Sequence, residues 1–304
     1  MLDIVSLGEL LIDLIPKERD MSNYPDYRMN AGGAPANVAV GCSQIGLKSG
    51  FIGKVGDDVF GRTLKGTLEK KGVNTENLLL GEESETRIGI VSIEGGKWNQ
   101  YFYGNPCADE LLSPEEIDKE LLEGSKVFHF GTISMIEEPS RSATLKALEI
   151  AEENGLIISM DPNFRVTLWE DEERPRSMVD EVIDSVDILK LNEEEIEFFF
   201  DGNMEETAQE LAKDREWVLV TRGENGCYYT DGKNSGYTET YEAQMVDETG
   251  AGDAFMSAVI RGYLNNQDLK ETTEFANAAA ALTIGGYGVI PSLPSWKEVQ
   301  EFIK

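Results

Sequence analysis

The sequence has little histidine and few basic residues. Its 304 residues contain a single histidine, His129, and 27 lysines and arginines against 57 aspartates and glutamates, which gives a formal net charge of −30. Nucleic acids and anionic membranes bind basic surfaces, so we expect neither as a partner. The acidic residues form many short runs, a pattern typical of salt-adapted surfaces, heat-adapted surfaces and ordinary solubility. His129 is expected to pack within an apolar strand, so any general base should be a carboxylate.

Cysteines and long hydrophobic runs are also scarce. Cys42, Cys107 and Cys227 are far apart and form no CxxC pair, which argues against a disulfide framework or a zinc site and favours a reducing compartment. No run of 18 apolar residues predicts a spanning helix. The first 16 residues carry three carboxylates and no basic segment, so they indicate a buried strand and not a signal peptide. We therefore expect a cytoplasmic protein.

Short apolar runs alternate with segments of helical periodicity along most of the chain. This order predicts one α/β domain, 1–304, with a mainly parallel sheet covered by helices on both faces. Residues 16–30 are polar and residues 86–103 alternate like a hairpin, which predicts a small β lid formed by about 14–31 and 86–105. The expected strands are 3–7, 49–55, 126–130, 156–160, 188–191, 217–221 and 226–229, and the expected helices are 36–45, 61–71, 140–154, 176–185, 192–200, 204–214, 253–265 and 270–284.

The stretch DETGAGDAF, residues 247–255, joins a glycine turn to the start of a helix. Free N–H groups at a helix N-terminus attract an anion, and glycine lets a phosphate group approach the backbone of Gly250, Ala251 and Gly252. A carboxylate at this place, Asp253, would repel a phosphate that was only bound there. Two interpretations are open from these residues alone: Asp253 caps the helix, or it takes part in a reaction beside the anion.

A second glycine pattern, GDDVFGRT at 56–63, has the spacing of a phosphate loop with Arg62 in the lysine position. Asp57 and Asp58 lie inside this loop and would repel a phosphate group. We interpret the segment as a turn in which one of these two aspartates caps the following helix.

Two glycines precede a helix in NAGGAPANVA, residues 30–39. Gly32 and Gly33 permit a ligand to approach the backbone, and Asn37 in the first turn offers both a donor and an acceptor. Asp13, expected at the end of the first strand, adds an acceptor that could take two hydroxyl protons. Each residue alone could belong to a turn or a cap, but together they have the chemistry of a sugar pocket.

Polar residues also follow the strands expected in the second half of the sheet. Arg165 comes after 156–160, at the edge where open α/β sheets bind ligands, and its guanidinium suits a phosphate group. The alternative is an ion pair with the acidic residues at 170–173. Asn192 and Glu195 share a face at a helix start, where they could hold the waters of a magnesium ion or simply be solvated.

The interpretation of two further features stays open from their residues alone. The glycine turn at 221–226 follows a strand and is either a plain hairpin or a phosphate loop. Asn277 is a lone polar side chain in a helix of small residues. In the hairpin at 86–103, Gln100 and Phe102 should face one side and Tyr101 and Tyr103 the other.

Two long motifs resemble those of the ribokinase-like (pfkB-type) carbohydrate kinases: GGAPAN at 32–37 and DETGAGD at 247–253. They occur in the order of the family, and the resemblance extends over 3–304. It implies a three-layer α/β/α fold with a mainly parallel central sheet and a small β-sheet lid. It also implies an ATP-dependent kinase that phosphorylates a primary sugar hydroxyl. GELLID, NPCAD and DPNFR are most similar to fructokinase segments.

The resemblance implies a role for each candidate residue. Asp253 corresponds to the catalytic base, supported by the amides of Gly250, Ala251 and Gly252 and by Arg165. The sugar-binding positions are Asp13, Gly32, Gly33, Asn37 and, in the lid, Phe102. The nucleotide-binding positions are Lys190, Asn192, Thr221, Gly223, Gly226 and Asn277. Asn192 and Glu195 match a magnesium motif, and Asp247, Thr249, Gly286, Gly288 and Ser292 match a site for a monovalent cation.

One position departs from the fructokinase pattern. Gly104 stands where such sequences usually carry arginine, so the lid brings no fixed positive charge to the substrate. This disfavours 2-keto-3-deoxygluconate, a carboxylate, more than a neutral ketose. The expected reaction is the conversion of D-fructose to D-fructose 6-phosphate with ATP, Mg²⁺ and K⁺. The alternatives are a 2-keto-3-deoxygluconate kinase and a sugar-binding regulator without catalysis. An exposed lid edge favours a homodimer.

Overall fold

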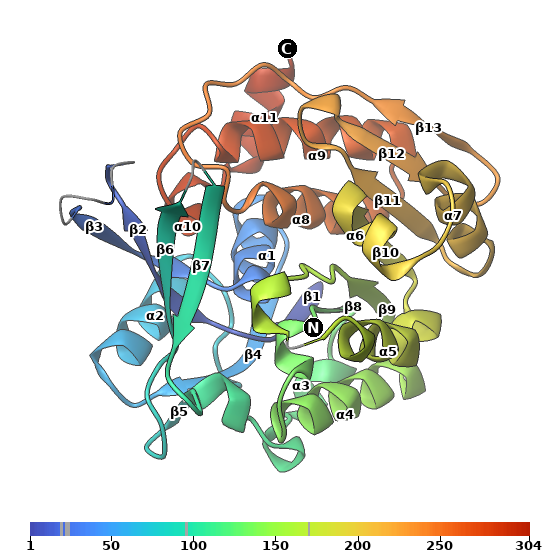
Figure 1. Ribbon diagram of the computed structural model, residues 1–304. Coiled ribbons are helices and arrows are strands. Elements are labelled where there is room, and N and C mark those ends of the chain that lie inside the picture. Colours follow the sequence, from blue (N-terminus) through green and yellow to red (C-terminus); the bar gives the residue numbers. More distant parts are fainter. Residues whose placement is uncertain (19–20, 22–24, 95–96, 170) are drawn as a thin grey trace.

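A nine-stranded sheet lies at the centre of the structure, a computed structural model that describes residues 1–18, 21, 25–94, 97–169 and 171–304 (Figure 1). The strand order is β13-β12-β11-β10-β9-β8-β1-β4-β5. All neighbours from β5 to β11 are parallel, whereas β12 and β13 are antiparallel additions at one edge. The sequence predicts every strand of this sheet except β5 and β13. The bounds are β1 (Ile4–Leu7), β4 (Ser49–Gly56), β5 (Leu78–Gly81), β8 (Val127–Phe130), β9 (Ile157–Met160), β10 (Ile188–Asn192), β11 (Trp217–Thr221), β12 (Cys227–Thr230) and β13 (Ser235–Thr238).

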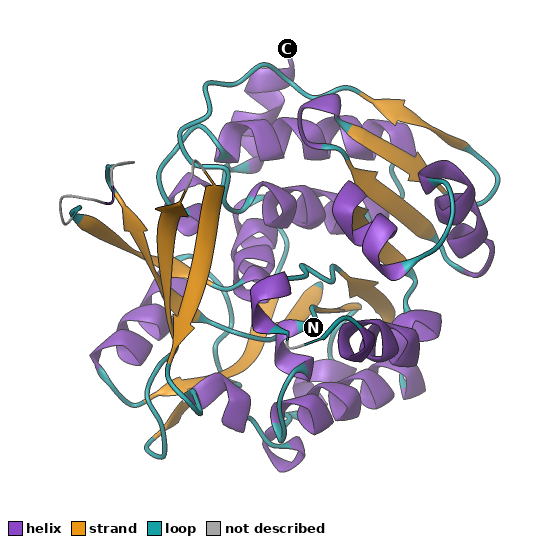
Figure 2. Ribbon diagram, in the orientation of Figure 1, coloured by secondary structure: helices purple, strands orange, loops and turns teal. Residues whose placement is uncertain are grey.

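Helices cover both faces of this sheet (Figure 2). Alternate strand residues enter different cores: Val5 and Phe128 pack with α4 to α7, while Ile4 and Val127 pack with α1, α8, α9 and α11. The predicted three-layer fold is therefore confirmed. The bounds are α1 (Ala34–Gln44), α2 (Val59–Lys70), α3 (Lys119–Glu123), α4 (Ser140–Glu153), α5 (Glu173–Val182), α6 (Glu193–Phe199), α7 (Met204–Leu211), α8 (Ala251–Leu264), α9 (Leu269–Thr283), α10 (Val289–Ser292) and α11 (Trp296–Ile303).

A four-stranded sheet stands at one side of the molecule, in the order β3-β2-β6-β7 (Figure 1). β2 and β6 are parallel, and β3 and β7 pair antiparallel on either side of them. The bounds are β2 (Leu11–Pro16), β3 (Tyr27–Gly32), β6 (Ile88–Glu94) and β7 (Lys97–Tyr103).

The placement of Asp13 at the end of the first strand is wrong. The chain leaves the large sheet after Leu7, turns at Gly8 and enters the small sheet at Leu11. Gly8 has a φ of 155°, and a Cβ there would lie 2.5 Å from Pro35 at the start of α1. Asp13 therefore lies inside β2, on the small sheet.

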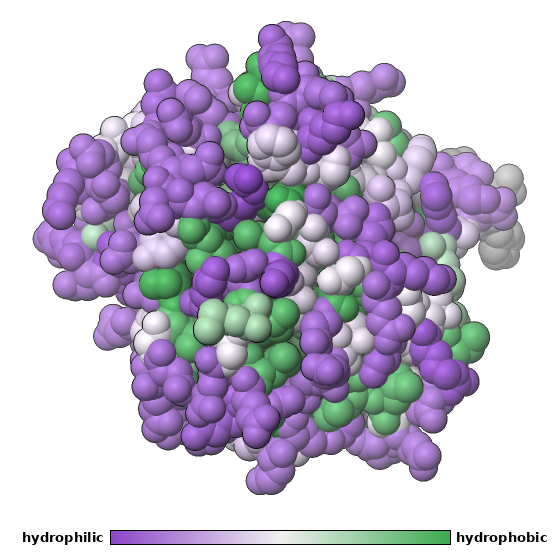
Figure 3. All heavy atoms as spheres, turned by 180° about the vertical axis from the view of Figure 1, so that it is seen from behind, coloured by the Kyte–Doolittle hydropathy of each residue, from purple (hydrophilic) through white to green (hydrophobic). Residues whose placement is uncertain are grey.

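A third core joins the two sheets. Ile12 of β2 packs with Val40 of α1, Leu64 of α2 and Val289 of α10. This contact holds one end of the small sheet against the helices while its other end projects. The face of the molecule that is turned away from the viewer in Figure 1 is largely hydrophilic, with hydrophobic residues gathered near its middle (Figure 3). None of the helices in the described part of the chain is long and apolar enough to cross a membrane.

Two sequence interpretations concern local structure only, and both are confirmed. The Asp58 carboxylate accepts hydrogen bonds from the backbone N–H groups of Phe60 and Gly61, so it caps α2 inside the apparent phosphate loop. His129 is buried in β8 with its Nδ1 2.9 Å from the Ser159 hydroxyl. Burial lowers the pKa of His129 to about 4, so this side chain is a neutral core residue.

Candidate active site

The glycine turn before α8 sets the direction in which this helix begins. Gly250 has a left-handed φ of 83°, and a Cβ on it would lie 2.2 Å from Val289. α8 begins at Ala251, two residues earlier than the sequence predicts, so Asp253 lies within its first turn. The Asp253 side chain forms no cap to its own helix. The N–H groups of this first turn have no partner within α8, and free N–H groups at a helix N-terminus favour an anion.

Asp253 and Asn37 meet where α1 and α8 pack together. The Asn37 amide nitrogen donates to Oδ2 of Asp253 over 2.8 Å, and both side chains are buried. The Asn37 Oδ1 is buried and has no partner among the described residues, so it is available to a ligand hydroxyl. Burial raises the pKa of Asp253 to about 6, while the hydrogen bond from Asn37 opposes that rise. A carboxylate with this pKa is suited to accept a proton near neutral pH.

Asp13 faces the same space from the small sheet. Its Oδ1 accepts a hydrogen bond of 2.6 Å from the Gln100 amide of β7, a partner that the sequence analysis did not assign to the site. A Cβ at Gly32 or Gly89 would overlap the Asp13 carboxylate, so both glycines make room for it. Burial raises the pKa of Asp13 to about 7, and the negative charge of Asp253 adds to this effect. Asp13 and Asp253 therefore belong to one electrostatic site.

Phe102 lies on the Asp13 face of the small sheet. The register aligns Phe102 with Gly89, Asp13 and Asn30 across the four strands. Tyr103, on the other face, is 59% exposed. The predicted division of the two faces is therefore confirmed, with Gln100 and Phe102 on the inner side. The central carbon of the Arg87 guanidinium lies over the Phe102 ring, 5.6 Å from its centroid, and restricts the position of the ring.

Gly104, which directly follows β7, has a positive backbone φ. Its φ is 113°, a region that side chains rarely adopt, and a Cβ there would lie 2.5 Å from the Cys107 sulfur. The local backbone conformation therefore favours glycine at this position, where the fructokinase pattern has arginine. An arginine placed here would require both the backbone and Cys107 to move.

Arg165 approaches the site from the loop after β9. Among the described residues its guanidinium contacts only the backbone carbonyl groups of Asn163 and Phe164, at 3.4 and 3.3 Å. The alternative ion pair with the acids at 170–173 lies partly outside the described residues, and no pair with residues 171–173 is present. The positive charge of Arg165 lowers the pKa of both Asp13 and Asp253 against the effect of burial. Arg165 thus lies within electrostatic reach of both carboxylates.

Asn192, which is partly buried, and Glu195, which is buried, are hydrogen-bonded partners and not a solvated helix start. Each caps the other at the beginning of α6: the Glu195 N–H donates to Asn192 Oδ1, and the Asn192 N–H donates to Glu195, both over 2.8 Å. The second oxygen of Glu195 accepts from the Phe164 N–H at 2.8 Å. This arrangement fixes the Arg165 loop against α6. Burial raises the pKa of Glu195.

Lys190 and Asp161 form a buried ion pair between these groups. The Lys190 ammonium lies 2.8 Å from Asp161 Oδ2, and both residues are at most 5% exposed. A Cβ added to Gly252 would lie 3.0 Å from the ammonium, so Lys190 reaches the first turn of α8. Asp161 is not among the site residues predicted from the sequence, although it directly follows a strand at the edge where such sheets bind ligands.

The turn between β11 and β12 lines a cavity of about 460 Å³. The turn is a hairpin, closed by the hydrogen bond from Arg222 N–H to the Gly226 carbonyl group. Of the predicted positions in this turn, Thr221, Gly223 and Gly226 lie next to the lining residues and are not among them. The lining residues are Arg222, Glu224, Asn225, Tyr237, Thr238, Glu239 and Thr240.

Asn277 contacts the wall of this cavity. Its amide nitrogen donates to the Thr238 hydroxyl and to the Glu239 carbonyl group, both at 3.0 Å. Asn277 is 5% exposed and is not a lining residue. Its position therefore indicates that it holds the cavity wall in place.

Asp247 ties together the two loops expected around a monovalent cation. One carboxylate oxygen accepts from the Thr249 N–H at 3.0 Å and the other from the Gly288 N–H at 3.1 Å. A Cβ at Gly286 would lie 2.2 Å from the Ser292 hydroxyl, so these residues also lie close together. Among the described residues no lysine or arginine pairs with Asp247, which is 4% exposed.

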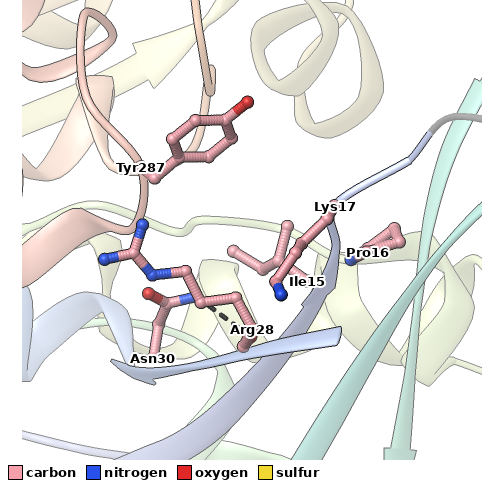
Figure 4. A pocket seen from close by; sticks show the side chains of 6 residues that line it. All are labelled: Ile15, Pro16, Lys17, Arg28, Asn30 and Tyr287. Carbon is pink, nitrogen blue, oxygen red and sulfur yellow. Dashed lines mark hydrogen bonds between the residues drawn. The ribbon is translucent and has the colours of Figure 1, made fainter. Parts of the chain in front are cut away.

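A smaller cavity of about 180 Å³ lies between the small sheet and the loop before α10 (Figure 4). Arg28 comes from β3 and Tyr287 from that loop, with the guanidinium 5.9 Å from the ring centre. Asn30 completes this contact: its side chain donates to the Arg28 carbonyl group, and a Cβ at Gly288 would lie 2.3 Å from its Oδ1. The small sheet is thus braced against the loop that also contacts Asp247. Ile15, Pro16, Lys17, Arg28, Asn30 and Tyr287 line the cavity.

Within the described part of the chain, no three His, Cys, Asp or Glu side chains are grouped as metal ligands. A metal ion at this site would therefore rely on waters, backbone oxygens or the oxygens of a bound substrate.

Comparisons with known proteins agree with this geometry. The chain is 40% identical over 314 aligned residues to probable fructokinase-3 of Arabidopsis thaliana, covering 99% of this chain and 91% of that protein. The crystal structure of a putative ribokinase II from E. coli with ATP and Mg²⁺ matches with a TM-score of 0.91 and 25% identity, covering 100% and 99% of the two chains. A double-mutant fructokinase from Vibrio cholerae with fructose, ADP and potassium matches with a TM-score of 0.89 and 28% identity, covering 100% and 99%.

The family model of the pfkB family carbohydrate kinases matches residues 1–296. That range contains Asp253, the glycine turn before it and the small sheet with Asp13. The resemblance on which the sequence analysis relied is therefore confirmed. The chain belongs to the pfkB family of carbohydrate kinases and is an ATP-dependent sugar kinase.

Proposed function

We propose that this chain transfers the γ-phosphoryl group of ATP to the primary 6-hydroxyl group of D-fructose. The observation that carries the proposal is the buried pair of Asn37 and Asp253, with a free amide oxygen on one side and a carboxylate of raised pKa on the other. A hydroxyl between them would donate to one group and lose its proton to the other. The similarity to plant and bacterial fructokinases supports fructose as the acceptor.

The reaction then divides among a few groups. Asp253 accepts the proton of the attacking hydroxyl as the bond from its oxygen to the γ phosphorus forms and the bond from that phosphorus to the bridging oxygen breaks. The amides of Gly250, Ala251 and Gly252 stabilise the charge on the transferring group. Arg165 adds a positive charge from the opposite loop. Phosphoryl transfer depends mainly on such positioning and charge stabilisation, so these groups suffice.

The acceptor is held mainly from the small sheet and the start of α1. Asp13 accepts hydrogen bonds from sugar hydroxyls, and Asn37 both donates and accepts. Gly32 and Gly33 keep this side of the pocket open to the sugar. Phe102, restricted in position by Arg87, covers the sugar and excludes water from the transfer.

The nucleotide binds along the other end of the cleft. The cavity beside the β11–β12 hairpin fits the base and ribose, with Thr221, Gly223 and Gly226 shaping the hairpin and Asn277 supporting its opposite wall. The phosphates then extend toward Lys190 and the first turn of α8. This direction places the γ-phosphoryl group beside Asp253.

A magnesium ion fits the charges at this end of the cleft. The ammonium group of Lys190 lies near three carboxylates, those of Asp161, Glu195 and Asp253. When all are ionised, these buried groups carry an excess of negative charge. Asn192 and Glu195 would hold the ion through its waters, because their own oxygens already serve the α6 cap. A bound magnesium ion supplies charge neutralisation to the phosphates.

Potassium fits the loops around Asp247. The ion would be held by Asp247, by Ser292 and by backbone oxygens at Thr249, Gly286 and Gly288, and it would order the anion-binding turn without entering the reaction. Activity should be higher in potassium than in tetramethylammonium buffer at equal ionic strength. Equal rates in the two buffers would contradict the cation site.

A coupled assay across neutral and acidic sugars tests the proposed function. We expect kcat/KM for D-fructose to exceed that for 2-keto-3-deoxygluconate by at least about tenfold, because no fixed charge from the lid meets a carboxylate. A preference for the sugar acid would establish the alternative kinase. Binding of fructose without turnover of any sugar would establish a regulator. Gly104→Arg is not a clean gain-of-charge test, because the backbone at Gly104 and its contact with Cys107 disfavour any side chain.

We further propose a homodimer in the cytoplasm. Met29 and Tyr101 align on the face of the small sheet opposite to Asp13, and both are about half exposed. A second copy packing on this face would cover them. Sedimentation of the wild type and of Met29→Glu would test the interface. The three cysteines are free and buried, which supports a reducing compartment.

A further inference from the structure

Lys190 is a buried cation to which the roles above give nucleotide binding alone. It lies on β10 at the centre of the large sheet, 5% exposed, with its ammonium 2.8 Å from Asp161 Oδ2. On the other side, the position of a Cβ on Gly252 is only 3.0 Å from the ammonium nitrogen. The ammonium group therefore lies between a carboxylate and the turn that receives the phosphoryl group.

A second buried lysine shows what a purely structural role looks like in this fold. Lys54 on β4 is 6% exposed, and its ammonium contacts Glu83, Glu116 at 2.9 Å and the Leu111 carbonyl group at 3.3 Å. These three acceptors use all three of its N–H donors. Lys54 is therefore fully satisfied by the protein.

Lys190 is not satisfied in this way. Among the described residues, Asp161 is its one hydrogen-bonding partner, which leaves two donors without a protein acceptor. Burial lowers the pKa of Lys190, but the charges of Asp161 and Glu195 more than reverse this effect. The group stays charged, and a buried charged donor without an acceptor is costly. A bound anion would supply the missing acceptors.

We propose that Lys190 is a catalytic residue that donates hydrogen bonds to the oxygens of the γ-phosphoryl group during its transfer, while Asp161 holds the ammonium at the anion-binding turn. This inference rests on the proposed function and gives Lys190 a role beyond nucleotide binding. Lys190 keeps its protons throughout. The phosphorus exchanges the bridging oxygen for the sugar oxygen, and the sugar proton goes to Asp253.

The geometry makes this contact specific for the transferring group. The ammonium lies against Gly252, one residue before Asp253, and not against the hairpin cavity in which the base and ribose are placed. Its charge would therefore act mainly where negative charge moves in the transition state. Removing one such donor costs about 10²- to 10³-fold in kcat in other enzymes.

The test compares Lys190→Met with Lys54→Met, because methionine keeps the apolar stem of each buried lysine and removes its charge. For Lys190→Met we expect kcat to fall by about 10²-fold or more, with KM for ATP changed less than about threefold. For Lys54→Met we expect a lower melting temperature but a kcat within about threefold of the wild type. A wild-type kcat in a folded Lys190→Met variant would overturn the proposal.

A second measurement separates the transferring group from simple nucleotide binding. In the wild type, aluminium fluoride added to ADP, magnesium and sugar should raise the melting temperature above that with ADP, magnesium and sugar alone. In Lys190→Met this additional shift should be lost, while the shift caused by ADP is kept. Loss of the ADP shift itself would make Lys190 a nucleotide-binding residue and contradict the proposal.

Two controls separate the role of Lys190 from an effect on stability and from the choice of sugar. If Lys190→Met fails to fold, Lys190→Met with Asp161→Asn removes the unpaired buried carboxylate and should restore the fold but not the turnover. Recovery of wild-type turnover in this double variant would overturn the proposal. If the wild type phosphorylates another sugar, the fructose assignment fails, but the comparison of the two lysines with that sugar still tests Lys190.

Discussion

The two proposed binding regions, the acceptor end around Asp253 and the nucleotide end beside the β11–β12 hairpin, are built in opposite ways. At the acceptor end, Asp13, Asn37 and Asp253 are each at most 7% exposed, and they come from β2, α1 and α8. At the nucleotide end, Glu224 and Glu239 are exposed, and the wall is supplied by the turn after β11 and by the end of β13 with the residues that follow it. Removing a buried polar side chain leaves its partner without a hydrogen bond, which costs more free energy than removing an exposed side chain. The contacts of an exposed side chain can be replaced by water. Single substitutions should therefore act strongly at the acceptor end and weakly at the nucleotide end.

The strongest test of this difference is Asp253→Asn. We expect kcat to fall by at least about 10²-fold, because asparagine cannot accept the proton of the sugar hydroxyl. The fold and the affinity for ADP should be retained, as asparagine has nearly the same shape. Stopped assays and calorimetric titration with ADP measure the two effects. Turnover within a few-fold of the wild type would show that another group is the base.

Asp13→Ala should act on the acceptor alone. A lost hydrogen bond to a charged group costs about 1.5–3 kcal/mol, so KM for fructose should rise by about 10- to 150-fold while KM for ATP stays unchanged. Asp26→Ala, an exposed carboxylate that precedes β3 on the same small sheet, is the matched control and should leave both constants as they are. A rise in KM for ATP with no change for fructose would move Asp13 out of the sugar pocket.

The pH profile tests the electrostatics of the acceptor end. The proposed reaction needs both Asp13 and Asp253 unprotonated, and burial raises their pKa values to about 7 and about 6, so kcat/KM for fructose should begin to fall below pH 7 and fall more steeply below pH 6. The hydrogen bond from Asn37 lowers the pKa of Asp253, so Asn37→Ala should move the acid limb to higher pH. A profile that stays flat down to pH 5, or an acid limb that moves to lower pH in the variant, would contradict this assignment.

The smallest effect is expected from Asn277→Ala. This change removes the two hydrogen bonds that hold Thr238 and Glu239 in the wall of the nucleotide cavity. Neutral hydrogen bonds contribute about 0.5–1.5 kcal/mol, so KM for ATP should rise by roughly two- to tenfold and kcat should change little. A loss as large as that of Asp253→Asn would show that the two ends of the cleft do not differ in the way described.

Much of this architecture could be predicted from the sequence because its signals are local. The GAG turn followed by a helical pattern predicts that Asp253 lies near the start of a helix. The position of Asp58 just before a helix predicts that it caps this helix. The break between β1 and β2 could not be predicted, because the first 16 residues remain apolar as the chain passes from one sheet to the other. Hydropathy reports burial but does not report which sheet buries a residue.

The missed parts of the site depend on contacts between distant segments. Gln100 reaches Asp13 only because the small sheet aligns β7 with β2 through β6. Asp161 meets Lys190 across two neighbouring strands of the large sheet. Asn192 and Glu195 have a sequence spacing that fits a metal motif and a helix cap equally well, and the structure shows the cap in place.

The backbone at Gly104 also limits how the substrate choice of this chain could change over time. An arginine at this position would have to follow changes that relax the positive φ and move the Cys107 sulfur away. A lineage carrying this glycine therefore cannot gain a charged lid by one substitution, and the intermediate steps would bring no benefit in binding an acidic sugar. Acidic sugars would more readily be accommodated by new charges elsewhere in the cleft. The present backbone thus acts as a historical constraint on substrate choice.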